Sequence, residues 1–364
     1  AEGDLEGPIL AHKGLDNTGW YRWADGGYVD WTGTGNTVDT SNPRVREAIV
    51  SALRWWAQDL GVDGFRFDLA VTLGRDGHGH FDPSHLGWLA SDPVLADRKL
   101  IAEPWDLGPH GYRLGGFGGE WREWNARFRD DVRDYWRGHG NAWTLVARLG
   151  GSTDVFGDRS PSASVNFVTA HDGFTMQDLV SYDHKHNEAN GEGNRDGHDD
   201  NRSWNSGVEG PTDDPAVTEI RRRRANALTA TLLLAKGVPM LLGGDELGRT
   251  KGGNNNSYPL DQPNWYRWDE HPRSALVEKL SSLRRRWPEL RSGDHHLVHD
   301  HPVAVVEVGR LLVICNPTGD DHRIPVPPTT RELLFDSSAP ERSGEVAGGV
   351  AVPSWSVLVL GPAA

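Results

Sequence analysis

The chain has 364 residues, which is long for one ordinary domain and fits one large domain with a smaller second one. Its 52 Asp and Glu residues outnumber 38 Lys and Arg residues, and the net charge of -14 argues against nucleic acid or an anionic membrane surface as the main partner. Cys315 is the only cysteine, so an internal disulfide is excluded and a reducing, cytoplasmic location is expected. No apolar run is long enough to span a bilayer, and we expect no membrane partner.

The first clear element is a helix over residues 42–60. Asn42 can cap this helix, Pro43 suits its first turn, and apolar residues recur along one face with the helical period. A strand at 62–68 follows directly after Gly61. The strand lacks the clean alternation of a half-exposed sheet, which favours a parallel strand covered on both faces.

Strands and helices then alternate along the chain. The sequence predicts further strands at 99–103, 164–169 and 238–242, and helical segments at 82–96, 121–137, 142–149, 220–236 and 272–286. Alternation with crossover spacing implies a parallel sheet, and the regular succession predicts an α/β fold of the (β/α)8 TIM-type barrel kind. We assign residues 1–290 to this catalytic barrel portion.

The pattern changes after the last of these helices. Short strands divided by Gly, Pro and Asp turns are expected at 303–308, 311–315, 331–335 and 357–360. No helical period appears among them. Residues 291–364 are therefore predicted to form a small C-terminal antiparallel all-β domain.

The number of predicted strands is too small for a closed barrel. Only four or five strand–helix units precede the β domain, and a closed barrel has about eight. A barrel that lacks its first strands has an open edge and exposed apolar surface. The chain does not begin with Met, and its first residues lack the features of a signal peptide. We expect it to be a C-terminal portion of a longer protein that folds poorly alone.

Three acidic residues each close a strand-like run. Asp68 ends Val-Asp-Gly-Phe-Arg-Phe-Asp, Glu103 follows Leu-Ile-Ala, and Asp172 follows Val-Asn-Phe-Val-Thr-Ala-His. Strand ends of a (β/α) barrel converge on one face, where active sites are built. Carboxylates that meet there suit cleavage of a glycosidic bond, which needs a nucleophile and a proton donor. A lone strand-end Asp is usually a helix cap, so the argument depends on all three together.

The neighbours of these acids suggest separate roles. Arg66 lies two residues before Asp68, on the same side of the strand, and its charge favours the ionised form of that carboxyl. Glu103 has no such neighbour in sequence, which makes it the better proton donor. Trp105 follows the second strand, and its flat apolar face suits stacking on a sugar ring.

No cofactor and no metal is expected. A loop at 183–201 holds several His, Asp and Glu residues, but their spacings match no zinc or calcium signature and favour a solvated loop near the substrate. The sequence has no nucleotide-binding glycine fingerprint and no hydrolase elbow. Asp245 and Glu246, after the last predicted strand, either line a sugar groove or form structural salt bridges.

Several long motifs resemble shared blocks of the α-amylase superfamily and, within it, the glycogen debranching and isoamylase group. They are Asp-Gly-Phe-Arg-Phe-Asp at 63–68, Ile-Ala-Glu-Pro-Trp-Asp at 101–106, Asn-Phe-Val-Thr-Ala-His-Asp at 166–172, His-Asn-Glu-Ala-Asn-Gly-Glu at 186–192, Gly-Val-Pro-Met-Leu-Leu at 237–242 and Gly-Asn-Asn-Asn-Ser-Tyr at 253–258. The resemblance runs from the first residues to about residue 290, and the small β domain matches in position and type. The superfamily block that supplies an Asp and a His ahead of the nucleophile does not precede Asp68.

The resemblance implies a role for each candidate residue. Asp68 would be the nucleophile that forms a covalent β-glucosyl intermediate, and Glu103 would be the general acid and then the general base. Asp172 would hold sugar hydroxyls in the distorted ring. Arg66 would pair with the nucleophile, and His171 would bond a hydroxyl of the same sugar.

The activity implied by the resemblance is hydrolysis of the α-1,6 branch linkages of glycogen or related α-glucans, with retention of configuration. The expected partner is therefore a branched α-glucan. The same three acids serve α-1,4-acting amylases and glucanotransferases, so these alternatives stay open. A hypothesis from another class is a non-catalytic glucan-binding protein, an inactive fragment in which the acids are a relic.

Overall fold

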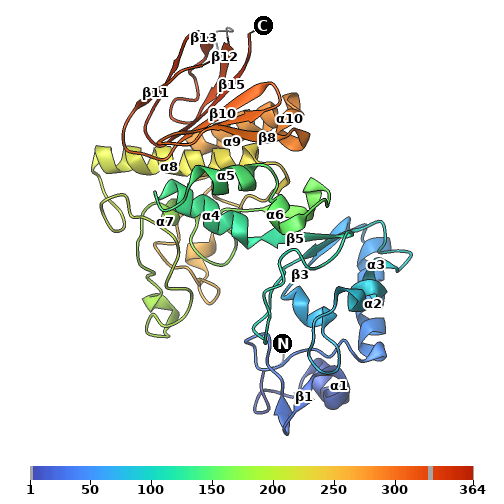
Figure 1. The fold of residues 1–364 in the computed structure, drawn as a ribbon. Helices are drawn as coiled ribbons and strands as arrows, with labels where there is room; N and C mark the ends of the chain where they lie inside the picture. Colours follow the sequence, from blue (N-terminus) through green and yellow to red (C-terminus); the bar gives the residue numbers. More distant parts are fainter. Residues whose placement is uncertain (1–2, 327–330, 364) are drawn as a thin grey trace. The chain divides into compact units, whose positions relative to one another are not determined.

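The computed structural model describes residues 3–326 and 331–363 (Figure 1). The chain divides into two compact units, which are considered separately. The first comprises residues up to 124 together with 158–165. The second comprises 125–157 and the residues from 166 onward.

The first unit contains the earliest predicted helix and the first two predicted strands. In α2, Asn42 caps the helix by accepting a hydrogen bond from the Arg44 N–H, and Pro43 occupies the first turn. The region expected to hold helical turns at 82–96 contains a short 3₁₀ turn and then α3. The elements of this unit are α1 (Ala11–Trp20), β1 (Trp23–Ala24), β2 (Gly27–Tyr28), α2 (Pro43–Gln58), β3 (Gly64–Phe67), α3 (Gly87–Ala90) and β4 (Lys99–Ala102), with β5 (Trp121–Asn125) crossing into the second unit at its last residue.

The predicted parallel pairing is present in this unit. β3 pairs with β4, placing Gly64 opposite Lys99, and β4 pairs in parallel with β5. A Cβ atom on Gly64 would lie 2.6 Å from the Cβ and the carbonyl oxygen of Lys99, so this position needs glycine for close strand packing. Apolar side chains of these strands and of the segment between them form a local core that includes Leu86, Leu100 and Trp121.

The prediction of a helix over the whole of 121–137 is wrong in its first turn. Residues Trp121–Asn125 form β5, and the helix α4 begins at Ala126. Along β5 the residues alternate between buried and half-buried, which is a strand period hidden by the charged composition of the segment. Asn125 ends the strand and caps the helix, since its side chain accepts a hydrogen bond from the Phe128 N–H.

The second unit contains the remaining helices. Helix α8 begins earlier than the predicted residue 220, because Asp214 caps it and Pro215 suits its first turn. The strands β6 (Ser164–Asn166) and β7 (Val238–Pro239) are shorter than predicted. Helices α5 and α9 match their predicted ranges. The helices are α4 (Ala126–Trp136), α5 (Ala142–Leu149), α6 (Thr153–Phe156), α7 (Met176–Leu179), α8 (Pro215–Leu234), α9 (Pro272–Arg286) and α10 (Glu289–Ser292).

The predicted C-terminal antiparallel sheet is confirmed. Six strands lie in the order β13-β12-β15-β10-β9-β8, and β11 pairs with β14 in a separate two-stranded sheet. The strands are β8 (His295–His299), β9 (Ala304–Val308), β10 (Leu311–Asn316), β11 (His322–Ile324), β12 (Arg331–Asp336), β13 (Gly344–Val346), β14 (Val350–Val352) and β15 (Ser356–Pro362).

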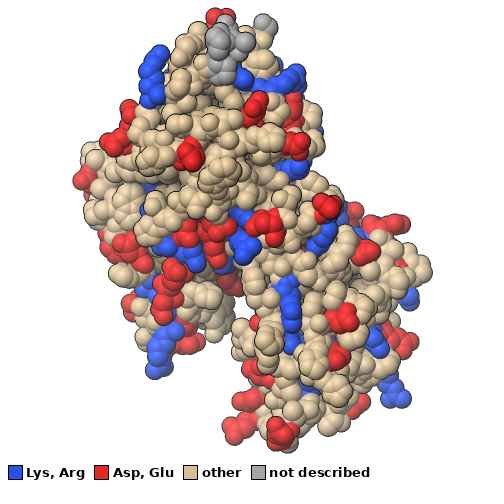
Figure 2. All heavy atoms as spheres, in the orientation of Figure 1, with Lys and Arg blue, Asp and Glu red and all other residues tan. Residues whose placement is uncertain are grey.

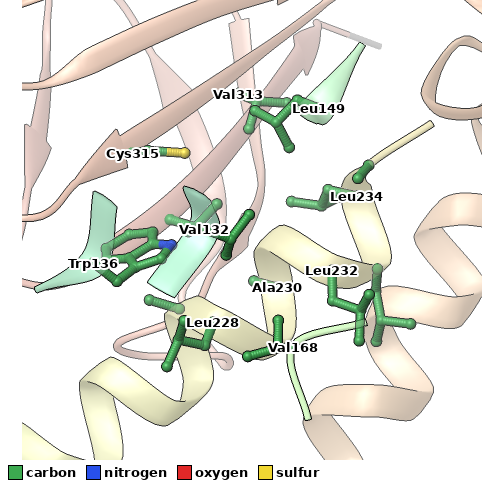
Figure 3. Packing of buried hydrophobic residues seen from close by; sticks show 14 of the residues in the cluster. Val132, Trp136, Leu149, Val168, Leu228, Ala230, Leu232, Leu234, Val313 and Cys315 are labelled. Atoms are coloured by element: carbon green, nitrogen blue, oxygen red, sulfur yellow. The ribbon is translucent and has the colours of Figure 1, made fainter. Parts of the chain in front are cut away.

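Both faces of this sheet are buried along its central strands β9, β10 and β15. Val313 and Cys315 of β10 belong to the large core built on α4, α5 and α8, where they lie near Val132 and Trp136 (Figure 3). The alternate residues, including Ile314, pack into a second apolar cluster on the opposite face. Because the larger core runs through helices and sheet alike, the predicted domain boundary at residue 290 stays a prediction.

The surface is mixed in charge. On the face shown in Figure 2, acidic and basic side chains are interspersed among uncharged ones. Within the described part of the chain, no helix combines the length and the hydropathy that crossing a membrane requires. The full (β/α)8 barrel and the absence of its first strands stay predictions.

Candidate active site

Two of the predicted acids meet in the first unit, at the ends of neighbouring parallel strands. Asp68 follows β3 and Glu103 follows β4. The backbone joins the two strand ends, since the Glu103 N–H donates to the Phe67 carbonyl at 3.0 Å and the Ala70 N–H donates to the Glu103 carbonyl at 3.0 Å. Leu69 adopts a left-handed conformation with φ 41°, a rare one for a branched residue that re-aims the chain directly after Asp68.

Arg66 links the two carboxylates. Its Nη1 donates to Asp68 Oδ1, and its Nη2 lies 3.1 Å from Glu103 Oε1. The guanidinium group also lies 4.2 Å from the ring centroid of Trp124, in cation–π geometry. Glu103 has no cationic neighbour in sequence, but pairing of β3 with β4 brings Arg66 to both acids in three dimensions.

The two carboxyl groups differ in their exposure to solvent. The side chain of Glu103 is 8% exposed, whereas that of Asp68 is 74% exposed. Burial raises the pKa of Glu103 to about 7, and the negative charge of Asp68 acts in the same direction. The Leu69 N–H, which donates to Glu103 Oε2 at 2.7 Å, and the charge of Arg66 oppose that rise. One carboxyl thus holds a proton near neutral pH beside a second that faces solvent.

An aromatic pair follows Glu103 in the chain. The rings of Trp105 and Tyr112 are nearly parallel, at 12°, with centroids 6.5 Å apart, and Tyr112 is exposed. Asp106, the residue after Trp105, has a fully buried side chain. It forms a bidentate ion pair with Arg75, and both N···O distances are 2.7 Å. This buried pair fixes the loop that carries Trp105. Trp105 therefore lies on an anchored loop directly after the predicted proton donor.

The third predicted acid lies in the second unit. Asp172 and His171 are both exposed, with His171 Nε2 3.3 Å from Asp172 Oδ2. Lys251 Nζ donates to the His171 carbonyl at 2.9 Å, and the Gly173 N–H donates to the Asn255 carbonyl at 2.9 Å. These contacts hold the His-Asp segment from both sides. The meeting of Asp172 with the two acids of the first unit stays a prediction.

Sequence reasoning missed the residues that support this segment. Lys251 is almost fully buried, and burial lowers its pKa. Its backbone N–H donates to Asp178, a buried carboxylate that also accepts from the Thr175 hydroxyl. The isolated lysine in a Gly- and Asn-rich segment was the only available signal, because a chain position says nothing about which carbonyl an ammonium will reach.

The loop at 183–201 is mostly exposed, as expected of a solvated loop, and side-chain amides hold it in place. Asn187 and Asn255 exchange two hydrogen bonds, from Asn187 Nδ2 at 2.8 Å and from the Asn255 N–H at 2.9 Å. Asn255 Nδ2 also donates to Asn201 Oδ1 at 2.8 Å. This amide network ties the loop to the segment around 253–256. Among the residues that the structure describes, no group of three or more His, Cys, Asp or Glu side chains is arranged to hold a metal.

Asp245 has a structural environment. It is fully buried, and its carboxylate accepts hydrogen bonds from the Thr169 hydroxyl and from the Met176 N–H at 2.9 Å. Burial raises its pKa to about 6. Of the two roles considered for it, a groove residue or a partner in a structural salt bridge, the contacts agree with a structural role, made through hydrogen bonds. Glu246 accepts a hydrogen bond from the Gly244 N–H at 2.9 Å.

Comparison with known proteins agrees with the motifs. A GlgX homolog of the glycogen operon in Mycobacterium tuberculosis is 50% identical over 294 residues, which cover 78% of this chain and 40% of that protein. A glycogen debranching enzyme of Erwinia tasmaniensis is 48% identical over 299 residues, or 80% of this chain and 45% of that protein. The chain is homologous to the glycogen debranching enzymes.

The predicted resemblance to this group is thereby confirmed for the aligned part of the chain. The chain spans less than half the length of these debranching relatives. A pullulanase of Anoxybacillus solved with maltotetraose matches the fold with a TM-score of 0.72 at 23% identity, over 94% of this chain and 50% of the pullulanase chain. A pullulanase of Bacillus acidopullulyticus gives a TM-score of 0.69 at 24% identity, over 94% of this chain and 43% of that chain. No family model matches the chain.

Proposed function

We propose that this chain carries the catalytic acids of a retaining glycoside hydrolase that cleaves α-1,6 branch linkages of glycogen or a related α-glucan. The observation that carries the proposal is the pair formed by buried Glu103 and exposed Asp68, joined by Arg66. The names of its relatives favour branch points over α-1,4 linkages. We further propose that the parallel strands belong to a (β/α)8 barrel and that the enzyme acts in the cytoplasm.

The two carboxyls divide the first step between them. Asp68, paired with Arg66, attacks the anomeric carbon, and Glu103 donates its proton to the glycosidic oxygen as the bond to the departing chain breaks. The product is a β-glucosyl ester on Asp68. Formation of this ester removes the negative charge that raises the pKa of Glu103, so Glu103 becomes a better-ionised base for the second step.

The second step restores the enzyme. Glu103 takes a proton from water, whose oxygen attacks the anomeric carbon and releases the Asp68 carboxylate. Two displacements at one carbon give net retention. Asp172 and His171 are proposed to bind hydroxyls of the reacting sugar, and Trp105 to stack on a neighbouring ring.

Release of reducing ends from glycogen and from linear amylose tests the proposal. The wild-type chain, Asp68→Asn and Asp63→Asn would be compared, the last being a matched control because Asp63 is exposed and precedes the same strand. We expect activity on glycogen alone, lost in Asp68→Asn and kept in Asp63→Asn. Activity on amylose would instead favour an α-1,4-acting amylase. A folded chain that binds glucan without cleaving it would favour the non-catalytic alternative.

A further inference from the structure

A cavity of about 360 Å³ lies in the second unit, at the junction of the helices with the C-terminal sheet. Its lining includes the aromatic residues Trp136, Trp204 and Trp355 and the polar residues Ser203 and His139. Its volume lies within the range of about 300–1,000 Å³ that is typical of small-molecule sites. None of the residues proposed for catalysis lines it. The cavity and the candidate active site therefore share no lining residue.

Two half-buried tryptophans form the aromatic wall. The rings of Trp204 and Trp355 have centroids 6.0 Å apart and are inclined at 46°. The Arg224 guanidinium lies 4.2 Å from the Trp204 centroid and supports that ring by a cation–π contact. Gly319 contributes to the same wall, and a Cβ atom there would lie 3.2 Å from the Trp355 ring. The wall is thus shaped by residues that fix the two indoles.

Trp355 is held in a conformation that a tryptophan rarely adopts. Its φ is 45°, in the left-handed region, where a bulky side chain is a genuine outlier. Such strain persists only where the surroundings impose it, and it gathers at ligand-binding positions. The Trp355 N–H donates to the Thr318 carbonyl at 3.1 Å. The strained residue thus lies in the wall of the cavity itself.

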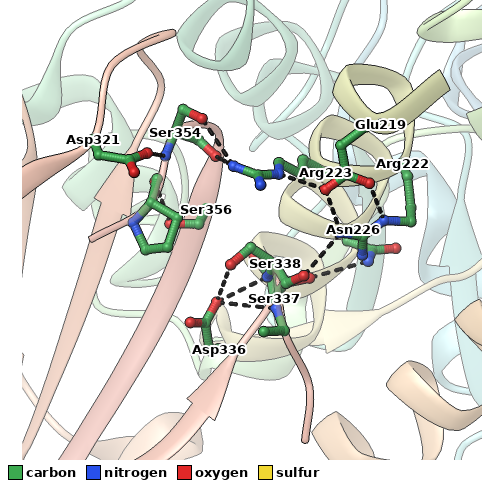
Figure 4. A network of polar contacts seen from close by, with 12 residues as sticks. Glu219, Arg222, Arg223, Asn226, Asp321, Asp336, Ser337, Ser338, Ser354 and Ser356 are labelled. Atoms are coloured by element: carbon green, nitrogen blue, oxygen red, sulfur yellow. Dashed lines mark hydrogen bonds and ion pairs between the residues drawn. The ribbon is translucent and has the colours of Figure 1, made fainter. Parts of the chain in front are cut away.

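The residue before Trp355 is pinned from two sides (Figure 4). The Ser354 N–H donates to Asp321 Oδ1 at 2.8 Å, and Arg223 Nη1 of α8 donates to Ser354 Oγ at 2.9 Å. Arg223 is itself held by an ion pair with Glu219 at 2.7 Å. These bonds connect the strained turn to the longest helix of the second unit, so the indole has little freedom to relax into an ordinary conformation.

The chemistry of the lining selects a neutral, hydroxyl-rich ligand. None of the described residues that line the cavity is acidic, and the charge of Arg137 is balanced by Asp134, which accepts from its Nε at 2.8 Å. Flat indole faces suit the apolar faces of sugar rings, while Ser203 and His139 offer groups for their hydroxyls. A strongly anionic ligand would meet no unbalanced arginine here.

We propose that this cavity is a second glucan-binding site, which holds a segment of an α-glucan chain away from the catalytic acids. The choice of α-glucan as the ligand rests on the proposed function, and the existence of the site rests on the cavity and the strained indole. Such a site would raise the local concentration of a polymeric substrate without changing the chemistry.

Calorimetric titration with maltoheptaose tests the proposal, with Asp68→Asn as the parent so that no turnover occurs. Trp355→Gly is the informative variant, because glycine accepts a φ of 45° without strain while the indole is removed. Trp143→Ala is the matched control, since Trp143 is 65% exposed on α5 and lies outside the cavity lining. We expect binding at this site to weaken by about tenfold in Trp355→Gly and to stay unchanged in the control.

Trp355→Phe separates a binding role from a packing role. The phenylalanine ring should restore most of the affinity that Trp355→Gly loses. If the indole had only a structural role, Trp355→Gly would lower the melting temperature and leave maltoheptaose binding intact. Maltoheptaose binding equal to that of the parent in a folded Trp355→Gly chain would overturn the proposal. Absence of hydrolysis by the folded wild-type chain, with Trp355-dependent binding retained in the Asp68→Asn parent, would overturn the proposed catalysis and leave this site standing.

Discussion

The surroundings of Glu103 in the first unit and of Asp245 in the second make an instructive pair. Both carboxyls are buried, and burial is the main cause that raises the pKa of each, to about 7 for Glu103 and to about 6 for Asp245. By burial and pKa alone, the two would be equal candidates for a catalytic acid.

Their partners differ. Asp245 accepts from the Thr169 hydroxyl and the Met176 N–H, both inside the unit. Glu103 lies beside the exposed carboxyl of Asp68 and shares Arg66 with it. A raised pKa therefore reports burial, and only a second, accessible carboxyl makes the proton useful for a displacement reaction.

The largest expected effect is the loss of the proton donor. Glu103→Gln keeps the shape of the side chain but cannot transfer a proton, so we expect activity on glycogen to fall by about 10²–10⁴-fold. Reducing-end release measures this loss, and thermal unfolding checks that the variant is folded. A glycosyl fluoride, whose departure needs no acid, should form the ester on Asp68 at a nearly normal rate, seen as a burst of fluoride, while hydrolysis of that ester stays slow because the base is missing. Unchanged activity on glycogen would remove Glu103 from the mechanism.

Removal of the shared cation comes next. Arg66→Ala should lower kcat by about 10–100-fold, because a charged hydrogen bond to the nucleophile is lost. Arg66 also lowers the pKa of Glu103, so the alkaline limb of the activity profile, expected near pH 7 in the wild type, should move to higher pH. Arg54→Ala is the control in the same unit, since Arg54 is half exposed and pairs with Asp92. An unmoved limb would contradict the shared contact.

The wild type and Glu103→Gln should differ in how their stability depends on pH. Folding raises the pKa of Glu103, so the protonated Glu103 side chain contributes fully to the free energy of unfolding below about pH 4.5. This contribution is lost as the pH rises through about 7. Between pH 5 and 8 the wild type should therefore lose stability relative to Glu103→Gln, by about 1–3 kcal/mol. Melting temperatures of both chains across this range measure the difference, and parallel curves would contradict it.

Asp245→Asn should affect folding and spare chemistry. An amide in this place leaves one of two buried donors with a poorer partner, at a cost of about 1–3 kcal/mol in the free energy of unfolding. Activity per folded molecule should stay within about twofold, on the scale of a small change in positioning. Asp213→Asn, at an exposed position before α8, is the control. A large loss of kcat at unchanged stability would give Asp245 a role in catalysis.

The smallest expected effect concerns the aromatic pair after Glu103. Trp105→Ala should raise KM for glycogen by about 2–10-fold, as expected for the loss of one stacking contact, while kcat is unchanged. Trp105→Phe should restore most of the affinity. A fall in kcat at constant KM would assign the indole to the reacting sugar.

The sequence by itself determined helix α2 and the two strands that the first two acids follow. Helix α2 was readable because its cap and its proline are local signals, and Asp68 and Glu103 because each directly follows a strand-forming run. The prediction was wrong where the local sequence favours one element and pairing with a distant strand imposes another. The charged residues of 121–125 look helical, yet pairing with β4 makes them a strand.

Only the tertiary structure decided which acid is buried. The sequence paired Arg66 with Asp68, and the parallel register places it against Glu103 as well. Desolvation then raises the pKa of Glu103. The support of the His171 carbonyl by Lys251 and the strained indole of Trp355 were likewise invisible in the sequence. Burial and contacts between distant residues arise only when elements pack, whereas caps and periods are properties of a few adjacent residues.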